Sequence, residues 1–149
     1  DMDRFKMIND SYGHATGDLL LRSVANGLRD IQLLMRVDQS VSVRTGGDEF
    51  FVNLHDTSPI DTDRLQQLLD RMRGDTVTDD QGHRIRMAFS YGVAEAQGSP
   101  SIDQLMQQSD LFAYNDKADR RGATTTRSPR VRQPTRLSEL RSPSSASQA

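Results

Sequence analysis

The chain has 149 residues, a net charge of −2 and no cysteine. That length is enough for one domain with its own core, and the near-neutral charge argues against bulk attraction to nucleic acid. The lack of cysteine excludes a disulfide framework and a thiolate site, which fits a reducing cytosol, and no apolar run approaches the length that spans a membrane.

Two helices and a hairpin are predicted in the first part of the chain. Residues 5–12 have the pattern of a short helix that ends at Gly13. Residues 18–28 predict a second helix, because their apolar side chains share one face: Leu21, Val24, Ala25 and Leu28. Apolar and polar residues alternate on both sides of Gly46-Gly47, which predicts a hairpin over residues 40–55.

The next elements are predicted from the same two patterns, an apolar stripe on one face of a helix and the composition of strands and turns. An apolar stripe predicts a helix over residues 62–73. Residues 79–82 have the composition of a turn, and we expect it to join a short strand near Thr76 to a longer strand over residues 85–93.

The last predicted element is a helix over residues 102–120, with Ser101 as its N-cap. The segment 123–149 is rich in Ser, Thr, Pro and Arg and has no sustained apolar period, so we interpret it as a disordered tail. The tail's five arginines face one acid, and a solvated linker is preferred over a site for an anionic partner. The folded domain is therefore expected over residues 1–122.

Three motifs carry a resemblance to a known family. Residues 1–18 read DMDRFKMINDSYGHATGD, and residues 46–50 read GGDEF. Near the other end, the spacing D-x-x-x-Y-x-x-K-x-x-x-R is formed by Asp110, Tyr114, Lys117 and Arg121. In this order the motifs resemble the GGDEF family of diguanylate cyclases. The resemblance implies an α+β fold, the ferredoxin-like palm of nucleotide cyclases, in which helices pack on a mostly antiparallel sheet.

The chain starts on the first acid of the family pattern, Asp1, which in the family ends the first strand. We therefore expect a fragment of a longer protein, with the order β-α-α-β-β-α-β-β-α once the missing first strand is restored. That strand is central in the implied fold, so the fragment is expected to fold poorly alone. The resemblance further implies a cytoplasmic domain, with an upstream sensory or membrane region in the full-length protein.

Acidic residues at the hairpin tip predict a metal site. A tight turn that ends in Asp48-Glu49 holds carboxylates where hard cations can reach them. If the first strand lies beside the hairpin, as the resemblance implies, the ligands of Mg²⁺ (or Mn²⁺) are Asp1, Asp48 and the backbone carbonyl of Met2. Either Asp48 or Glu49 could help to deprotonate the attacking hydroxyl, and the sequence leaves this choice open. Taken alone, each acid would be an ordinary surface residue.

Asn9 and Asp18 match the pair that recognises guanine in the family. A carboxylate can accept hydrogen bonds from the ring N–H and the exocyclic amine of guanine, whereas adenine lacks both donors at those places. Asp18 has a second possible role, because an Asp after Gly is also a good N-cap for the following helix. For His14, a contact with substrate and a structural hydrogen bond are equal alternatives.

Lys117 and Arg121 match the family's phosphate-binding pair and are four residues apart, so they share one helix face. The alternative is a solvated helix end, where cations complement the helix dipole. Lys6 is a further candidate for contact with phosphates. Asp116 and Arg120 depart from the family pattern in this helix. Asp116 and Asp119 add negative charge, and Arg120 replaces an expected glycine. These changes are expected to weaken affinity for GTP.

Many family members carry an inhibitory product site with the pattern R-x-x-D. At the corresponding offset this chain has Val37 and Ser40, while Arg36 and Asp38 are nearby but wrongly spaced, so we expect the site to be absent.

The preferred function is that of a diguanylate cyclase, in which a homodimer converts two GTP into cyclic di-GMP and two pyrophosphates. The alternative is a catalytically silent GGDEF module that binds GTP or a partner protein. An adenylate or guanylate cyclase of the same palm ancestry is disfavoured by Asn9 and Asp18.

Overall fold

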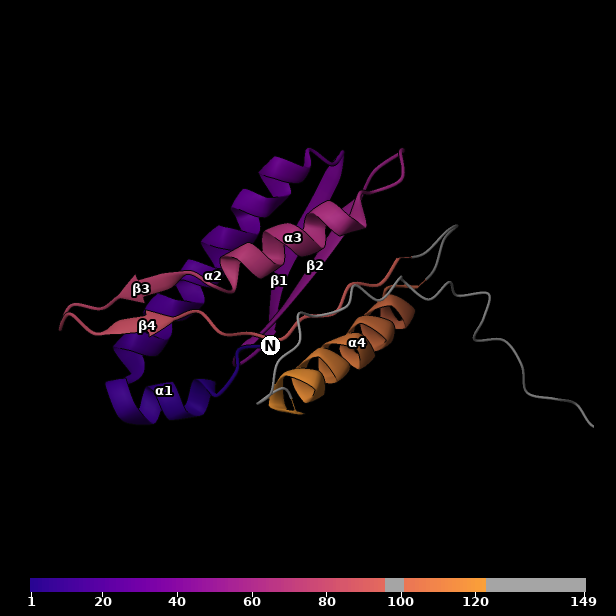
Figure 1. Ribbon diagram of the computed structural model, residues 1–149. Helices are drawn as coiled ribbons and strands as arrows, with labels where there is room; N and C mark the ends of the chain where they lie inside the picture. The colour runs from indigo at the N-terminus through magenta and orange to yellow at the C-terminus, as the bar shows by residue number, and fades with distance from the viewer. Residues whose placement is uncertain (96–100, 123–149) are drawn as a thin grey trace, which may run out of the picture. The chain divides into compact units, whose positions relative to one another are not determined.

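The computed structural model describes residues 1–95 and 101–122, so the expected tail lies outside the described residues. The described residues form two compact units, and the boundary between them falls after Ser90 (Figure 1). Seven of the eight helices and strands belong to the first unit. The observed class is α+β, as expected.

Helices α1 (Phe5–Tyr12) and α2 (His14–Met35) open the fold. The first confirms the prediction, and Gly13 separates the two helices with a φ of 86° that favours glycine. The second is longer at both ends than the predicted span of 18–28. Its start was missed because the residues after Gly13 show no apolar period, and it continues because buried Ile31 extends the apolar face.

The predicted hairpin is confirmed as strands β1 (Gln39–Gly46) and β2 (Glu49–His55). The strands pair antiparallel, with Ser42 opposite Val52, and the register shifts between Arg44 and Gly46. The alternating valines of β1 do not join the core, since Val41 is 57% exposed. The period therefore predicted the strand correctly, although it did not mark burial.

Helix α3 (Thr62–Met72) and strands β3 (Thr76–Thr78) and β4 (Arg84–Arg86) complete the first unit. The helix begins as its sequence suggests, because the Asp61 side chain accepts a hydrogen bond from the Arg64 backbone N–H at 2.9 Å. Figure 1 shows α2 and α3 beside the β1–β2 hairpin. Apolar side chains of α2, α3 and residues 85–89 fill the core: Leu20, Leu21, Val24, Leu69, Met72, Ile85, Met87 and Phe89.

The strand predicted over residues 85–93 is shorter than expected. Regular pairing ends at Arg86, and beyond it a single antiparallel bridge joins Phe89 to Met2. The strand is shorter because the chain changes its pairing partner: after Arg86 it leaves β3 and forms hydrogen bonds with residues 1–3 instead. Only a short stretch of pairing forms there, and residues 91–95 are not in a strand.

Residues 1–3 connect the two small sheets through backbone hydrogen bonds. The Met2 N–H donates to the Asp48 carbonyl at 3.1 Å, while the Asp3 N–H donates to the Ala88 carbonyl at 2.8 Å. The expected single sheet is therefore present as two hairpins of two strands, β1–β2 and β3–β4, with residues 1–3 hydrogen-bonded to the chain on both sides. Residues 1–3 therefore lie between the two hairpins, where the resemblance places the end of the first strand.

Helix α4 (Ile102–Gly122) belongs to the second unit. Its predicted cap is confirmed as a reciprocal pair: the Ser101 hydroxyl accepts from the Gln104 N–H, and the Gln104 side chain accepts from the Ser101 N–H, both at 3.2 Å. Gly92 lies against this helix, because a Cβ there would be 2.0 Å from the Ser109 carbonyl oxygen. None of the described helices is both long and apolar enough to cross a membrane.

The junction of α1 and α2 depends on a close contact between Asn9 and Gly17. A Cβ on Gly17 would lie only 1.9 Å from Asn9 Oδ1. The same Asn9 oxygen is buried and accepts no hydrogen bond from the described residues. The missing side chain at Gly17 thus gives α1 room to pack on α2 with the Asn9 amide in between.

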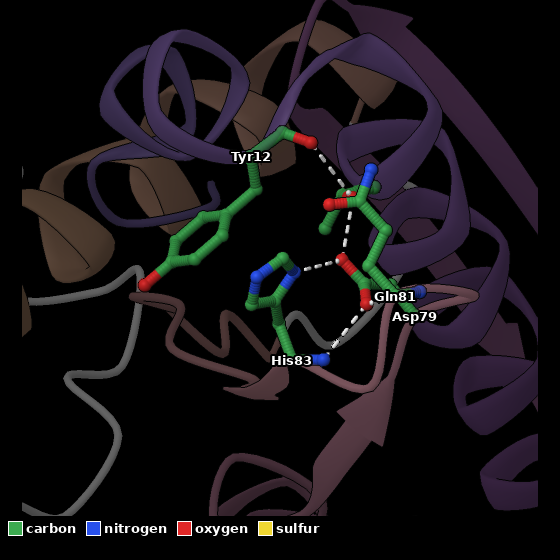
Figure 2. A network of polar contacts seen from close by, with 5 residues as sticks. Tyr12, Asp79, Gln81 and His83 are labelled. Carbon is green, nitrogen blue, oxygen red and sulfur yellow. Dashed lines mark hydrogen bonds and ion pairs between the residues drawn. The ribbon is translucent and has the colours of Figure 1, made fainter.

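The β3–β4 turn is built around Asp79. Its Oδ1 accepts the backbone N–H groups of Gln81 and His83 at 3.0 and 2.8 Å, and its Oδ2 lies 2.9 Å from His83 Nδ1 and 3.0 Å from the Thr16 hydroxyl (Figure 2). Burial raises the pKa of this carboxyl, but hydrogen bonds from His83, Thr16 and Gln81 outweigh burial and lower the pKa to about 2.

We expect acid to destabilise the protein partly through Asp79. Because its folded-state pKa is lowered, the ionised carboxylate stabilises the fold above about pH 4, and this contribution is lost as the pH falls towards about 2. In an Asp79→Asn variant, the free energy of unfolding measured with urea should be lower at neutral pH and should fall less steeply in acid. Asp80→Asn, in the same turn, is the control. An unchanged acid slope in Asp79→Asn would contradict the assignment.

Replacing Gly17 by Ala should destabilise the protein, although Ala is normally favoured over Gly in a helix interior by about 1 kcal/mol. The added methyl group would displace the Asn9 amide. In an Asn9→Ala background the nearest obstacle is gone and the Phe5 ring remains, 3.2 Å from the added Cβ, so the same Gly17→Ala change should destabilise the protein much less. Thermal melting of the two single variants and the double variant tests this. The idea fails if Gly17→Ala stabilises the protein while Asn9 is present.

Candidate functional site

The predicted metal ligands come from two adjacent backbone segments. The hydrogen bond from the Met2 N–H to the Asp48 carbonyl places residues 1–3 beside the start of β2. Met2 is only 2% exposed, so its side chain anchors this segment in the core. The premise of the metal prediction, that Asp1 and Met2 run next to Asp48, is therefore present in the structure. Metal binding itself stays a prediction.

The donor set suits a cation that needs few protein ligands. Within residues 1–95 and 101–122, no group of three or more His, Asp or Glu side chains is placed to hold a metal ion. The predicted set has only two carboxylates and one backbone carbonyl. Mg²⁺ commonly binds one or two carboxylates and completes its shell with phosphate oxygens and water. The residues present fit a metal that arrives with a nucleotide.

The Gly46-Gly47 turn is held by a residue that the sequence analysis did not single out. The Arg44 guanidinium donates to the Gly47 carbonyl from Nε at 3.0 Å and from Nη2 at 2.5 Å. Asp48 follows directly and is half-buried, whereas Glu49 is exposed at the start of β2. The only sequence signal for Arg44 was its place just before the glycine pair. Its two hydrogen bonds fix the turn that carries both acids.

Asp18 is not a helix cap. Helix α2 begins at His14 with Gly13 at the N-cap position, so Asp18 lies inside the helix and cannot satisfy its first N–H groups. The capping alternative is therefore wrong. The Asp18 side chain is exposed and makes no hydrogen bond or ion pair with the part of the chain that the structure describes. Both of its oxygens are available to a ligand.

Asp18 lines a groove of about 440 Å³ between α2 and the β1–β2 hairpin. It is the one acid among the described residues that line this groove. The other polar groups are mostly basic or uncharged and the floor is apolar: Leu21, Arg22, Ala25, Leu28, Arg29, Gln32, Ser42, Val43, Arg44 and Phe50. Asp18 is thus the single carboxylate in a groove whose lining also holds three arginines, Arg22, Arg29 and Arg44.

Asn9 is half-buried on α1. Its Oδ1 atom is buried and accepts no hydrogen bond from the described residues. Lys6 is exposed on the same helix, and His14 is the exposed first residue of α2. The His14 ring makes no hydrogen bond or ion pair with the described part of the chain, which removes support for its structural alternative. The candidate polar residues thus cluster around the α1–α2 junction.

Lys117 and Arg121 belong to α4 in the second unit, and the Arg121 side chain lies outside the described residues. Within that unit, Asp116 Oδ2 lies 3.5 Å from Arg120 Nε and accepts from the Tyr91 N–H at 3.3 Å. The two departures from the family pattern therefore oppose each other in charge. Asp116 adds less net negative charge beside Lys117 than its sequence position suggested.

Asp38, near the offset expected for an inhibitory site, holds the hairpin ends together. Its Oδ2 accepts from the backbone N–H and the hydroxyl of Thr57, both at 3.1 Å. Its own N–H donates to Asp56 Oδ2 at 3.2 Å. Val37 is half-buried and Ser40 is exposed in β1. These contacts give Asp38 a structural role, while the absence of product inhibition stays a prediction.

Comparison with known proteins identifies relatives of this chain. The family model described as "Diguanylate cyclase, GGDEF domain" matches residues 1–123. The diguanylate cyclase DosC of Escherichia coli is 36% identical over 124 residues, which make up 82% of this chain and 25% of DosC. The diguanylate cyclase DgcS of Shewanella oneidensis is 34% identical over 125 residues, or 81% of this chain and 38% of DgcS. The chain thus spans about a quarter to two fifths of these relatives.

Solved structures agree with the family match. The GGDEF domain of DgcB from Caulobacter crescentus, solved in complex with c-di-GMP, is 25% identical with a TM-score of 0.64, covering 83% of this chain and 70% of that one. The match over residues 1–123 contains the hairpin acids, the α1–α2 junction and α4. By this match and by its relatives, the chain belongs to the GGDEF-domain family of diguanylate cyclases.

Proposed function

We propose that this chain is an active diguanylate cyclase domain, which condenses two GTP into cyclic di-GMP and two pyrophosphates. The observation that carries the proposal is the backbone pairing of Met2 with Asp48, which brings the N-terminal motif against the intact Asp48-Glu49 tip. Relatives named diguanylate cyclases support it over the matched residues.

Asp1, Asp48 and the Met2 carbonyl would hold Mg²⁺ (or Mn²⁺), which would neutralise the triphosphate when bound. The tip has little freedom of its own, because Arg44 holds the Gly47 carbonyl and Met2 holds the Asp48 carbonyl. Asp48 or Glu49 would take the proton of the attacking 3′-hydroxyl. A turn fixed from both sides keeps these carboxylates at a constant distance from the nucleotide.

Guanine would be read at the α1–α2 junction. The Asp18 carboxylate, which has no partner among the described residues, would accept hydrogen bonds from the ring N–H and the exocyclic amine of guanine. The Asn9 amide would offer a further acceptor on turning away from Gly17, against which its unpartnered Oδ1 is buried. An unpartnered buried oxygen is costly in the free protein, so a ligand donor there would recover a hydrogen bond.

Phosphates would be bound by Lys117 and Arg121, with Lys6 and His14 as further contacts. The reaction joins two nucleotides, and each subunit holds one GTP. The proposal therefore includes a homodimer, in which each 3′-hydroxyl attacks the α-phosphate held by the partner subunit. The diguanylate cyclase SiaD of Pseudomonas aeruginosa has been solved in complex with its activator SiaC. It is 25% identical to this chain, with a TM-score of 0.67, and the match covers 80% of this chain and 44% of that one. It supports control of this domain by a partner or an attached regulatory region.

The second candidate is a silent GGDEF module that binds GTP and acts as a regulator. The altered sequence of α4 favours it, because Asp119 adds an acid close to Lys117 and Arg120 replaces the glycine expected there. Incubation of the full-length protein with GTP and Mg²⁺, followed by mass identification of the product, separates the two. Cyclic di-GMP that disappears when a chelator is added supports the enzyme, whereas bound but unchanged GTP supports the silent module.

We expect Asp48→Ala to abolish turnover in the full-length protein while the fold survives. The change removes a metal ligand and a possible base from a turn, and little packing is lost because Asp48 is not in the core. Product formation and the melting temperature should be measured on the same preparation. Asp30→Ala, which removes an exposed acid from α2, is the matched control and should stay active. An active Asp48→Ala enzyme would refute the metal assignment.

Asp18→Asn should lower the use of GTP by on the order of a hundredfold or more, because an amide donor would face two donors of the base. The melting temperature should not change, since Asp18 is exposed inside α2 and does not cap it. GTP kinetics and thermal melting test both statements, with Asp30→Asn on the same helix as the control. Normal kinetics in Asp18→Asn would show that the carboxylate does not read the base.

A further inference from the structure

A polar cluster outside the proposed site joins the β3–β4 turn to the α1–α2 junction. Figure 2 shows the Asp79 carboxylate between the His83 ring and α2. The Thr16 hydroxyl lies 3.0 Å from Asp79 Oδ2, across 63 residues of sequence, and 3.0 Å from the Tyr12 carbonyl oxygen. Tyr12 and His83 also pack against each other, with ring centroids 5.3 Å apart. We call these four residues the junction clamp.

The β3–β4 turn itself orients the Asp79 carboxylate of the clamp. Asp79 Oδ1 is held by the backbone N–H groups of Gln81 and His83, so the carboxylate presents Oδ2 to Thr16 in a fixed direction. Thr16 is 4% exposed, which shields this contact from water. The two acceptors of the Thr16 hydroxyl belong to different elements, the end of α1 and the β3–β4 turn. The hydroxyl therefore sits where three elements meet.

The clamp acts on the two residues that we place at the guanine edge. Tyr12 is the last residue of α1, which carries Asn9, while Thr16 lies two residues before Asp18 on α2. Between them stands Gly13, whose N–H donates to the Asn9 carbonyl and whose carbonyl accepts from the Gly17 N–H, so its backbone ties both helices but has no side chain to pack against either. Helix α1 has only eight residues, so its position depends on tertiary contacts rather than on its own stability.

We propose that Thr16 and Asp79 are positioning residues, which set the angle between α1 and α2 and thereby the spacing of Asn9 and Asp18 for guanine. This rests on the proposed guanine-reading role of that pair. The Asn9–Gly17 contact fixes how closely the helices approach, and the clamp fixes how they are rotated about Gly13. Recognition of one base edge by two side chains tolerates displacements of only about 0.5 Å, so a small rotation is enough to lose it.

The test compares two nucleotides in the full-length protein. Inosine triphosphate lacks the exocyclic amine of guanine, so the ratio of the dissociation constants for GTP and ITP reports the alignment of the base edge. Wild type should prefer GTP by on the order of tenfold, the worth of one buried hydrogen bond. Thr16→Val, which keeps the shape and removes the hydroxyl, should lose most of this preference. Thr16→Ser, which keeps the hydroxyl, should retain it.

Ser23→Ala is the matched control, because it removes a hydroxyl from α2 that donates only to the Leu19 carbonyl of the same helix. It should leave the ratio unchanged. If Thr16→Val melts before it can be measured, His83→Ala offers a milder loosening of the clamp, since this side chain is 43% exposed. It too should lower the preference for GTP.

The outcomes separate the two hypotheses. A preserved GTP preference in folded Thr16→Val and His83→Ala overturns the positioning role, and so does an equal loss of affinity for both nucleotides. A wild-type protein that binds GTP and ITP equally overturns the guanine-reading assignment, and with it the purpose of the clamp. A preference that is lost in Thr16→Val and restored in Thr16→Ser supports both.

Discussion

The backbone pairing of residues 1–3 connects the site and the fold. On one side the Met2 N–H reaches Asp48, and on the other the Asp3 N–H reaches Ala88, so this short segment joins the two hairpins. The buried Met2 side chain provides the apolar contact that keeps the segment in place. The acids of the N-terminal motif and the hairpin tip meet through these few hydrogen bonds. A change that weakens them would affect the stability of the first unit and the geometry of the proposed metal ligands together.

Around this pairing, the residues proposed to bind nucleotide are kept apart from those that hold the structure. Arg44 donates hydrogen bonds within the Gly46-Gly47 turn, and Asp38 accepts them at the ends of the hairpin strands. Asp79 accepts a hydrogen bond from Thr16 at the α1–α2 junction. Asp18, in contrast, has no partner among the described residues, and the Asn9 oxygen is buried without a donor there. Water can solvate the exposed Asp18 carboxylate, whereas a buried oxygen without a donor is costly, so the Asn9 oxygen is the unusual one of the two.

Charge in α4 changes the expectation drawn from its unusual sequence. Asp116 and Arg120 replace uncharged family residues, and each alone would alter the field beside Lys117. As an ion pair they largely cancel, and the Tyr91 N–H takes up part of the remaining charge of Asp116. Asp119 is an added acid that lacks such compensation in the described contacts of the second unit. It is thus the stronger reason to keep the silent module as the second candidate.

Local chemistry was enough to predict the α1 boundary at Gly13, the β1–β2 hairpin, α3 and the Ser101 cap, because each depends on the φ of a glycine, a period or a neighbouring side chain. The motifs also named the side chains expected to form the site, and this assignment stays a prediction. The full length of α2 could not be predicted in this way. For the same reason the sequence alone could not exclude that Asp18 caps the helix. The pairing of residues 1–3 with Asp48 and Ala88, and the contact of Thr16 with Asp79, join residues far apart in the chain. Such contacts form only when the chain packs in three dimensions. No periodic pattern or fixed spacing in the sequence indicates them.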